Sequence, residues 1–160
     1  MPKQVLINIF IAILWMFLQD SWTVLAFFSG YLCGLLIIFI LRRYFKEKFY
    51  IFTLIAAVHL LLVFFWEAIT SSFAVIKEIL RPKITLTPGI FKLETGLRTE
   101  VEITLISLLL TLTPGSVVME TIPEKGIIYL HGMDMPESKE AVMKSAKRFE
   151  KAIKRVTRND

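Results

Sequence analysis

The sequence predicts a membrane protein in which N-terminal hydrophobic helices, a hairpin plus a third helix, precede a small α+β domain of the order β-β-α-β-β-α. Three observations lead to this fold class. The first half contains three long stretches without Asp, Glu, Lys or Arg. From residue 83 onward, short apolar runs are separated by Pro, Gly and charged residues. Those runs show both the two-residue period of strands and the 3.6-residue period of helices.

The uncharged stretches have lengths that suit membrane helices. They are 14, 21 and 18 residues long and run over Val5–Leu18, Ser21–Leu41 and Phe49–Trp66. About 20 helical residues, at about 1.5 Å each, cross a hydrocarbon core of about 30 Å. We therefore expect a membrane domain at 1–81 with helices at about 4–18, 22–43 and 49–80. The first stretch is short for a crossing and needs Lys3 to extend toward the headgroups.

The distribution of basic residues predicts the orientation of the hairpin. The turn at Asp20 contains no Lys or Arg, whereas residues 42–48 contain four. Loops rich in Lys and Arg stay in the cytoplasm, so we expect this loop and the N-terminus on that side.

The third stretch leaves more than one topology open. It is apolar on every side, which favours a spanning or protein-buried helix over one that lies flat on the membrane. If it crosses, the domain after it lies outside the cell. If the domain is cytoplasmic, either this helix re-enters against protein or all three helices cross with the N-terminus outside.

Five residues of the hydrophobic half are candidate functional positions. Ala26, Gly30 and Gly34 are spaced four apart, which permits close helix approach, either to the first helix or to another subunit. His59 and Glu67 are ionisable, and such groups within a membrane often line an ion path. The simpler interpretation places Glu67 at the headgroup boundary and His59 in a hydrogen bond with a neighbouring helix. We favour it, because two groups on one helix do not form a proton relay.

Residues 82–160 are predicted to form the α+β domain. Strands are expected at Ile84–Thr87, Ile90–Glu94, Ser116–Ile122 and Gly126–His131, with a core helix at Arg98–Leu112 and a last helix that begins near Pro136. In the last helix an apolar stripe opposes a basic face; the stripe comprises Val142, Ala146, Phe149, Ile153 and Val156. Such a helix covers the sheet, docks on a partner or touches anionic lipid, and we favour the first of these.

The sequence contains no motif for catalysis, a cofactor or a metal ion. It has no phosphate-binding glycine loop, no zinc-protease motif and no nucleophile elbow, so we predict neither an enzyme nor a cofactor. Cys33 is the only cysteine, and His131 has no second His or Cys with which to bind a metal. In residues 82–160, ten acidic residues nearly balance twelve basic ones, which argues against a nucleic-acid partner.

Two short motifs carry a family resemblance. Thr111-Leu-Thr-Pro-Gly115 and Tyr129-Leu-His-Gly132 resemble segments of the E subunit of the Mrp/Mnh multisubunit Na⁺/H⁺ antiporters, although Ser116 stands where Thr is common. The helix order extends the resemblance along essentially the whole chain. It implies a multi-pass protein of the bacterial cell membrane with a cytoplasmic C-terminal domain. It also implies partners, namely large antiporter-like subunits, small hydrophobic subunits and membrane lipid.

The resemblance also predicts a function. The chain is expected to be a non-catalytic subunit that is needed for assembly or stability of a complex that exchanges cytoplasmic Na⁺ for external H⁺. Thr113, Pro114 and Gly115 form a sharp helix stop, which is either a fold element, as we favour, or a docking corner for a neighbouring subunit. Two alternatives stay open. The chain could contribute Glu67 and His59 to an ion path at a subunit interface, or it could be a stand-alone membrane-anchored adaptor.

Overall fold

The computed structural model describes residues 2–44, 48–82, 86–135 and 137–158. The chain folds as two compact units that divide after Ile55, and we take each unit by itself. Among the described residues, two helices are long and apolar enough to cross a membrane, Val24–Tyr44 and Tyr50–Ile79, while the first helix is shorter. The division between a membrane domain at 1–81 and a cytoplasmic domain at 82–160 stays a prediction.

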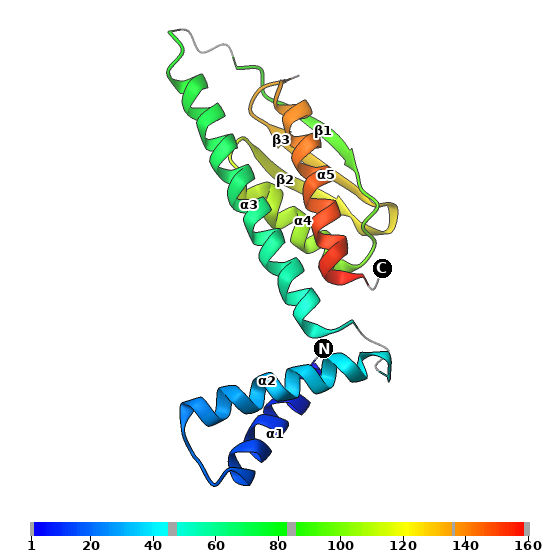
Figure 1. The fold of residues 1–160 in the computed structure, drawn as a ribbon. Coiled ribbons are helices and arrows are strands. Elements are labelled where there is room, and N and C mark those ends of the chain that lie inside the picture. Colours follow the sequence, from blue (N-terminus) through cyan, green and yellow to red (C-terminus); the bar gives the residue numbers. More distant parts are fainter. Residues whose placement is uncertain (1, 45–47, 83–85, 136, 159–160) are drawn as a thin grey trace. The chain divides into compact units, whose positions relative to one another are not determined.

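The first unit is a helical hairpin. It consists of α1 (Pro2–Leu18) and α2 (Val24–Ile40), which continues into the 3₁₀ turn η1 (Leu41–Tyr44), and it includes the start of α3 (Tyr50–Ile79) (Figure 1). Thr23 caps α2, because its hydroxyl accepts a hydrogen bond from the Ala26 amide at 3.2 Å. The connection turns at Asp20, whose φ of 45° lies in the left-handed region that Asp tolerates better than most residues.

Small residues allow α1 and α2 to approach closely. Ala26, Gly30 and Gly34 are buried along one side of α2. A Cβ atom placed on Gly30 would lie 2.7 Å from Cβ of Trp15 and 3.0 Å from Cα of Ala12. Within this chain the helix that faces the glycines is therefore α1.

A polar cluster joins α1 to the first residue of α3. The Tyr50 amide donates to Oε1 of Gln4 at 2.9 Å, and Asn8 donates to the Tyr50 hydroxyl at 2.8 Å. That hydroxyl in turn donates to the Tyr31 hydroxyl at 2.9 Å. Gln4 and Asn8 are fully buried, so these bonds offset part of the cost of removing their amides from water, while Oδ1 of Asn8 has no hydrogen-bond partner among the described residues.

The second unit combines the rest of α3 with a three-stranded antiparallel sheet and two further helices. After α3 come β1 (Gly89–Glu94), α4 (Glu100–Leu112), β2 (Ser116–Ile122), the 3₁₀ turn η2 (Pro123–Lys125), β3 (Ile127–Gly132) and α5 (Glu137–Thr157). The sheet order is β1-β3-β2, with Phe91 opposite Leu130 and Val118 opposite the same residue from the other side. β3 is the central strand and forms a hairpin with β2.

The described residues therefore follow the order β-α-β-β-α rather than the predicted β-β-α-β-β-α. Of the additional predicted strand, Ile84–Thr87, the first two residues lie outside the described ranges, and Leu86 and Thr87 are not in a strand. Thr87 instead bonds the segment that precedes α5. Its hydroxyl donates to Asp134 at 2.9 Å, and its carbonyl accepts from the Met135 amide at 2.8 Å. The amide of Thr87 also donates to Asp134 at 3.1 Å, so both backbone groups that a strand would pair are used by this distant segment.

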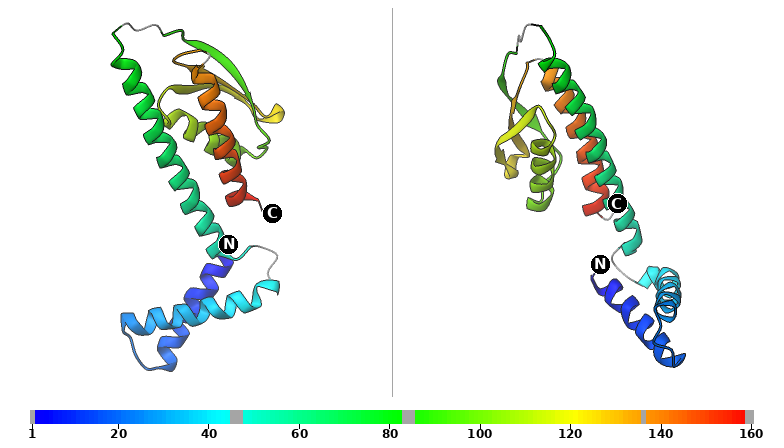
Figure 2. Two further views of the ribbon diagram at one scale, coloured as in Figure 1. Left: turned by 45° about the horizontal axis from the view of Figure 1, so that its top comes forward. Right: turned by 90° about the vertical axis from the view of Figure 1, so that its left-hand side faces the viewer.

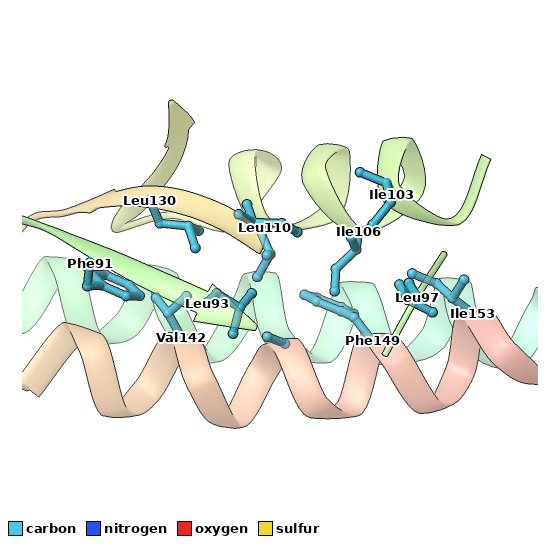
Figure 3. Close-up of a cluster of buried hydrophobic side chains, with 12 residues drawn as sticks. Phe91, Leu93, Leu97, Ile103, Ile106, Leu110, Leu130, Val142, Phe149 and Ile153 are labelled. Carbon is cyan, nitrogen blue, oxygen red and sulfur yellow. The ribbon is translucent and has the colours of Figure 1, made fainter. Parts of the chain in front are cut away.

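The core of the second unit lies on one face of the sheet. Alternate residues of β1 and β3 point toward α4 and α5, as Figure 3 shows for Phe91, Leu93 and Leu130. From the helices, Ile106, Leu110, Phe149 and Ile153 fill the same cluster and are almost completely buried. The predicted sheet-covering face of the last helix is thus the face that packs on the sheet.

Glu102 ties the N-terminus of α4 to the C-terminus of α5. It forms a capping box with Thr99, and its carboxylate accepts hydrogen bonds from Thr157 at 2.8 Å and from Nε of Arg158 at 2.9 Å. The Arg158 guanidinium lowers the pKa of Glu102 far below its ordinary value of 4.5, although burial of the carboxyl opposes this shift. The fold therefore favours the ionised form.

We predict that Gly30→Ala destabilises the hairpin. The new methyl group would meet Trp15 and the backbone of Ala12, so the helices must move apart at a cost of about 1–3 kcal/mol. Thermal unfolding in detergent, followed by circular dichroism, measures the loss. The control is Val24→Ile, which enlarges a side chain of α2 that is 74% exposed and should change little. Equal unfolding temperatures for both variants would contradict close packing at Gly30.

A second prediction concerns acid stability. Because the pKa of Glu102 is lowered on folding, its stabilisation is complete above its unfolded pKa of about 4.5 and is lost as the pH falls below that value. Glu102→Gln should remove about 1–3 kcal/mol at pH 7 and flatten the decline of stability below pH 4.5. Denaturant unfolding at a series of pH values tests this. Glu100→Gln, at an exposed neighbouring position, should keep the wild-type slope.

Candidate functional site around Glu67

Glu67 is the buried carboxylate of α3, and only 3% of the residue is exposed. Both of its oxygens accept hydrogen bonds from α5. The Ser145 hydroxyl donates to Oε2 at 2.5 Å, and Nη1 of Arg148 donates to Oε1 as part of an ion pair. Ser145 and Arg148 are three residues apart on one helix, so they project from the same side of α5. We call this three-residue cluster the Glu67 tie.

Apolar residues of α3 that precede Glu67 contact the core of the second unit. Leu60, Val63 and Phe64 precede Glu67 and pack against the core of the sheet domain. In Figures 1 and 2, α3 and α5 run side by side in every view, with opposite chain directions. One side of α3 is therefore an integral part of the second unit rather than a free surface.

A cavity of about 570 Å³ lies beside the Glu67 tie. The residues that line it come from α3, α5, the corner between α4 and β2, the segment after β3 and Leu86. Among them are Glu67, Val75, Pro114, Gly115, Asp134 and Arg148. The cavity thus brings together two positions that the sequence marked separately, the Glu67 carboxylate and the Pro114-Gly115 turn.

The Thr113-Pro114-Gly115 segment is a tight corner between α4 and β2. Thr113 is the C-terminal cap of α4 and is buried, and its hydroxyl donates to the Leu109 carbonyl at 2.7 Å. Gly115 has φ of 100°, a conformation that side chains rarely allow. A Cβ atom on Gly115 would lie 3.8 Å from the side chain of Val75 on α3, which is ordinary contact. The corner therefore faces α3 of its own chain.

The structure does not bring the two candidate ion-path residues together. His59 is exposed, whereas Glu67 is buried against α5. Eight residues of helix separate them, which is about 12 Å along the axis and about 80° around it. Ala26, Gly30 and Gly34 belong to the other unit and have no part in this site. In the described part of the chain, no group of three or more His, Cys, Asp or Glu side chains could hold a metal ion.

Ser145 and Arg148 were not identified from the sequence. Arg148 lies among the many basic residues of the last helix, and none of its neighbours in the sequence indicates a buried acidic partner. Ser145 gave a weak signal, because it is a small polar residue next to the apolar stripe at Ala146. Gln4 and Asn8 were also missed, although two amides in an otherwise apolar helix could have suggested an internal polar contact.

An apolar helical hairpin precedes an α+β unit, and two helices of the described residues are long and apolar enough to cross a membrane, an organisation typical of a membrane-associated protein. A sequence model described as "Na+/H+ ion antiporter subunit" matches residues 8–156. The E subunit of the Na(+)/H(+) antiporter of Bacillus subtilis (strain 168) is 40% identical over 158 residues, which are 99% of this chain and 100% of that protein. The chain therefore belongs to this family of antiporter subunits.

One further relative and chains of two solved structures are also similar to this chain. The corresponding E subunit of Alkalihalophilus pseudofirmus is 37% identical over 99% of this chain and 100% of its own length. A chain of the Mrp complex from Dietzia is 33% identical over 64% of this chain and 96% of its own, with a TM-score of 0.45. A chain of an archaeal membrane-bound sulfane sulfur reductase covers 96% of this chain and 98% of its own at 22% identity, with a TM-score of 0.55, and shows a shared fold.

We predict that Glu67→Ala destabilises the second unit by about 1–3 kcal/mol. The change leaves the buried Ser145 hydroxyl without its acceptor and removes the partner of Arg148, whose side chain is 55% exposed and so recovers part of its hydration. Glu140→Ala is the matched control, because Glu140 pairs with Lys144 where both side chains are largely exposed. It should cost much less than Glu67→Ala, because an ion pair in water contributes little to stability. Protease resistance and thermal unfolding both report the difference, and equal losses would contradict a structural Glu67.

Proposed function

We propose that this chain is a non-catalytic membrane subunit of a multisubunit Na⁺/H⁺ antiporter. In this proposal it is needed for assembly or stability of the complex that exchanges cytoplasmic Na⁺ for external H⁺. Family membership supports the antiporter, since the relatives that match along the full length are named as antiporter subunits. The geometry of the chain itself supports the non-catalytic part.

The observation that carries this function is the position of Glu67. An acidic residue in an ion path must release its protein partner to bind a cation or a proton. It must also lie close to a second ionisable group that continues the path. Both oxygens of Glu67 are already bound by Ser145 and Arg148. His59 is about 12 Å away along α3, so it does not continue a relay from this carboxylate. Glu67 thus fits a residue that holds the fold together.

The partners in this proposal are the other antiporter subunits, both the large antiporter-like ones and the small hydrophobic ones. The location is the bacterial cell membrane, with the hairpin crossing it and the C-terminal unit in the cytoplasm. The basic residues around the end of α2 support this side, because Arg42 and Arg43 follow an uncharged helix and are exposed. The glycines of α2 already face α1, which leaves the outer faces of the hairpin for lipid and neighbouring subunits.

The test separates assembly from transport. Glu67→Gln and His59→Asn are introduced together into cells that express the complete set of subunits. We expect less assembled complex in the membrane, measured by native gels, and unchanged Na⁺/H⁺ exchange per assembled complex in everted vesicles. The control variant is His59→Asn alone, which should alter neither quantity because His59 is exposed.

Two outcomes would overturn the proposal. Normal amounts of complex with abolished exchange would show that these residues take part in the ion path. A small particle that contains this chain alone, in native membranes solubilised with mild detergent, would favour a stand-alone adaptor instead.

A further inference from the structure

A stripe of large apolar side chains covers the side of α3 that faces away from the sheet domain. The stripe consists of residues that are each 49–77% exposed, namely Val58, Leu62, Phe65, Ile69, Phe73, Ile76 and Leu80. They are three or four positions apart, so at about 100° per residue they fall within an arc of about 80°. We call this set the outer stripe.

The opposite side of α3 is more polar than the outer stripe. Leu60, Glu67, Ser71 and Glu78 lie about 180° from its centre, and this is the side that packs on α5 and lines the cavity. A helix on the surface of a water-soluble protein turns its apolar side inward. In α3 apolar side chains lie on both sides, because Leu60, Val63 and Phe64 pack on the core while the outer stripe faces away from it. The outer stripe therefore requires an apolar environment of its own.

The outer stripe does not lie in the interior of a bilayer, because α3 does not cross one. Figures 1 and 2 show α3 beside α5, and Leu60, Glu67 and Glu78 of α3 face the core, α5 or the cavity that α5 lines. α5 exposes charged side chains, namely Lys144, Lys147 and Lys151. Placing these ammonium groups in hydrocarbon is too costly. The part of α3 before Leu60 is the ten residues Tyr50–His59, which span about 15 Å, half the thickness of a hydrocarbon core.

We propose that α3 lies along the cytoplasmic surface of the membrane, with the outer stripe inserted among phospholipids at the boundary between headgroups and acyl chains. Chain continuity supports this occupant, because α2 ends at Ile40 and continues into η1, which contains Arg42 and Arg43, and α3 begins only six residues after η1 ends. Trp66 and Lys77 flank the outer stripe on one side, as amphipathic and basic residues do in helices that bind anionic membrane surfaces.

An α3 that lies along the membrane surface departs from the expectation, drawn from the sequence, that this helix spans the membrane or is buried in protein. That expectation considered the helix alone, apolar on every side. The domain that follows covers one of those sides and leaves the outer stripe as a broad apolar face on the other, which fits an orientation parallel to the membrane. The C-terminal unit then stays on the same side of the membrane as the basic loop after α2.

The test measures depth in the membrane along α3. Full-length chain with Cys33→Ser receives one new cysteine at a time, as Leu62→Cys, Ile69→Cys, Phe73→Cys or Ile76→Cys, and each carries a nitroxide label. The vesicles contain phosphatidylethanolamine and phosphatidylglycerol. Relative accessibility to oxygen and to a water-soluble nickel chelate then gives the depth of each label. We expect one shallow depth for all four, about 5–10 Å below the headgroups.

Ala74→Cys is the matched control. It is one residue from Phe73 and exposed, but it lines the cavity, so its label should prefer the nickel chelate while the label at Phe73 prefers oxygen. A crossing helix would instead change the depth by about 21 Å between Leu62 and Ile76, and that gradient would overturn the proposal. Preference for the nickel chelate at all four positions would also overturn it.

The same labels in membranes from the native cells distinguish lipid from protein as the occupant. Retained oxygen accessibility at Phe73 and Ile76 is the expected result. Loss of accessibility to both reagents there would show that a protein covers the outer stripe, which would overturn the assignment to lipid.

Discussion

The structure depends on the partners of one carboxylate. A glutamate in the middle of an apolar helix is costly wherever water is excluded, unless both oxygens find donors. Glu67 finds them in Ser145 and Arg148, which lie on the last helix of the chain. This requirement draws α3 against α5, and the apolar residues that precede Glu67 then complete the core of the sheet domain. A segment with the composition of a membrane helix thereby becomes part of an α+β unit.

The same packing explains why two sequence features that seemed unrelated meet in space. The corner at Pro114 and Gly115 ends α4 and starts β2, and its outer side faces α3. The cavity between them is therefore bounded by the Glu67 tie on one side and by the corner on the other. In the hairpin unit, by contrast, close approach depends on missing side chains, since Gly30 leaves room for Trp15 and the backbone of Ala12.

Family membership and geometry contribute different things to the functional conclusion. The relatives define the kind of assembly in which such a chain is found. The geometry shows how this chain uses its own ionisable groups. Glu67 and Glu102 are each bound by a helix of the same unit, and His59 is exposed on its own. The two buried glutamates thus stabilise the fold of the second unit.

The sequence by itself determined the hydrophobic hairpin, the three described strands and both helices of the α+β unit, because length, periodicity, capping and turn residues are local properties. It also contained the motifs that carried the family resemblance. Only the tertiary structure decided that α1 faces the α2 glycines, that Ser145 and Arg148 bind Glu67, and that Thr87 bonds the segment before α5 instead of forming a strand. Each of these joins residues that are distant in the chain. The periodicity of one helix shows that a face must be covered, but what covers it depends on where the rest of the chain folds.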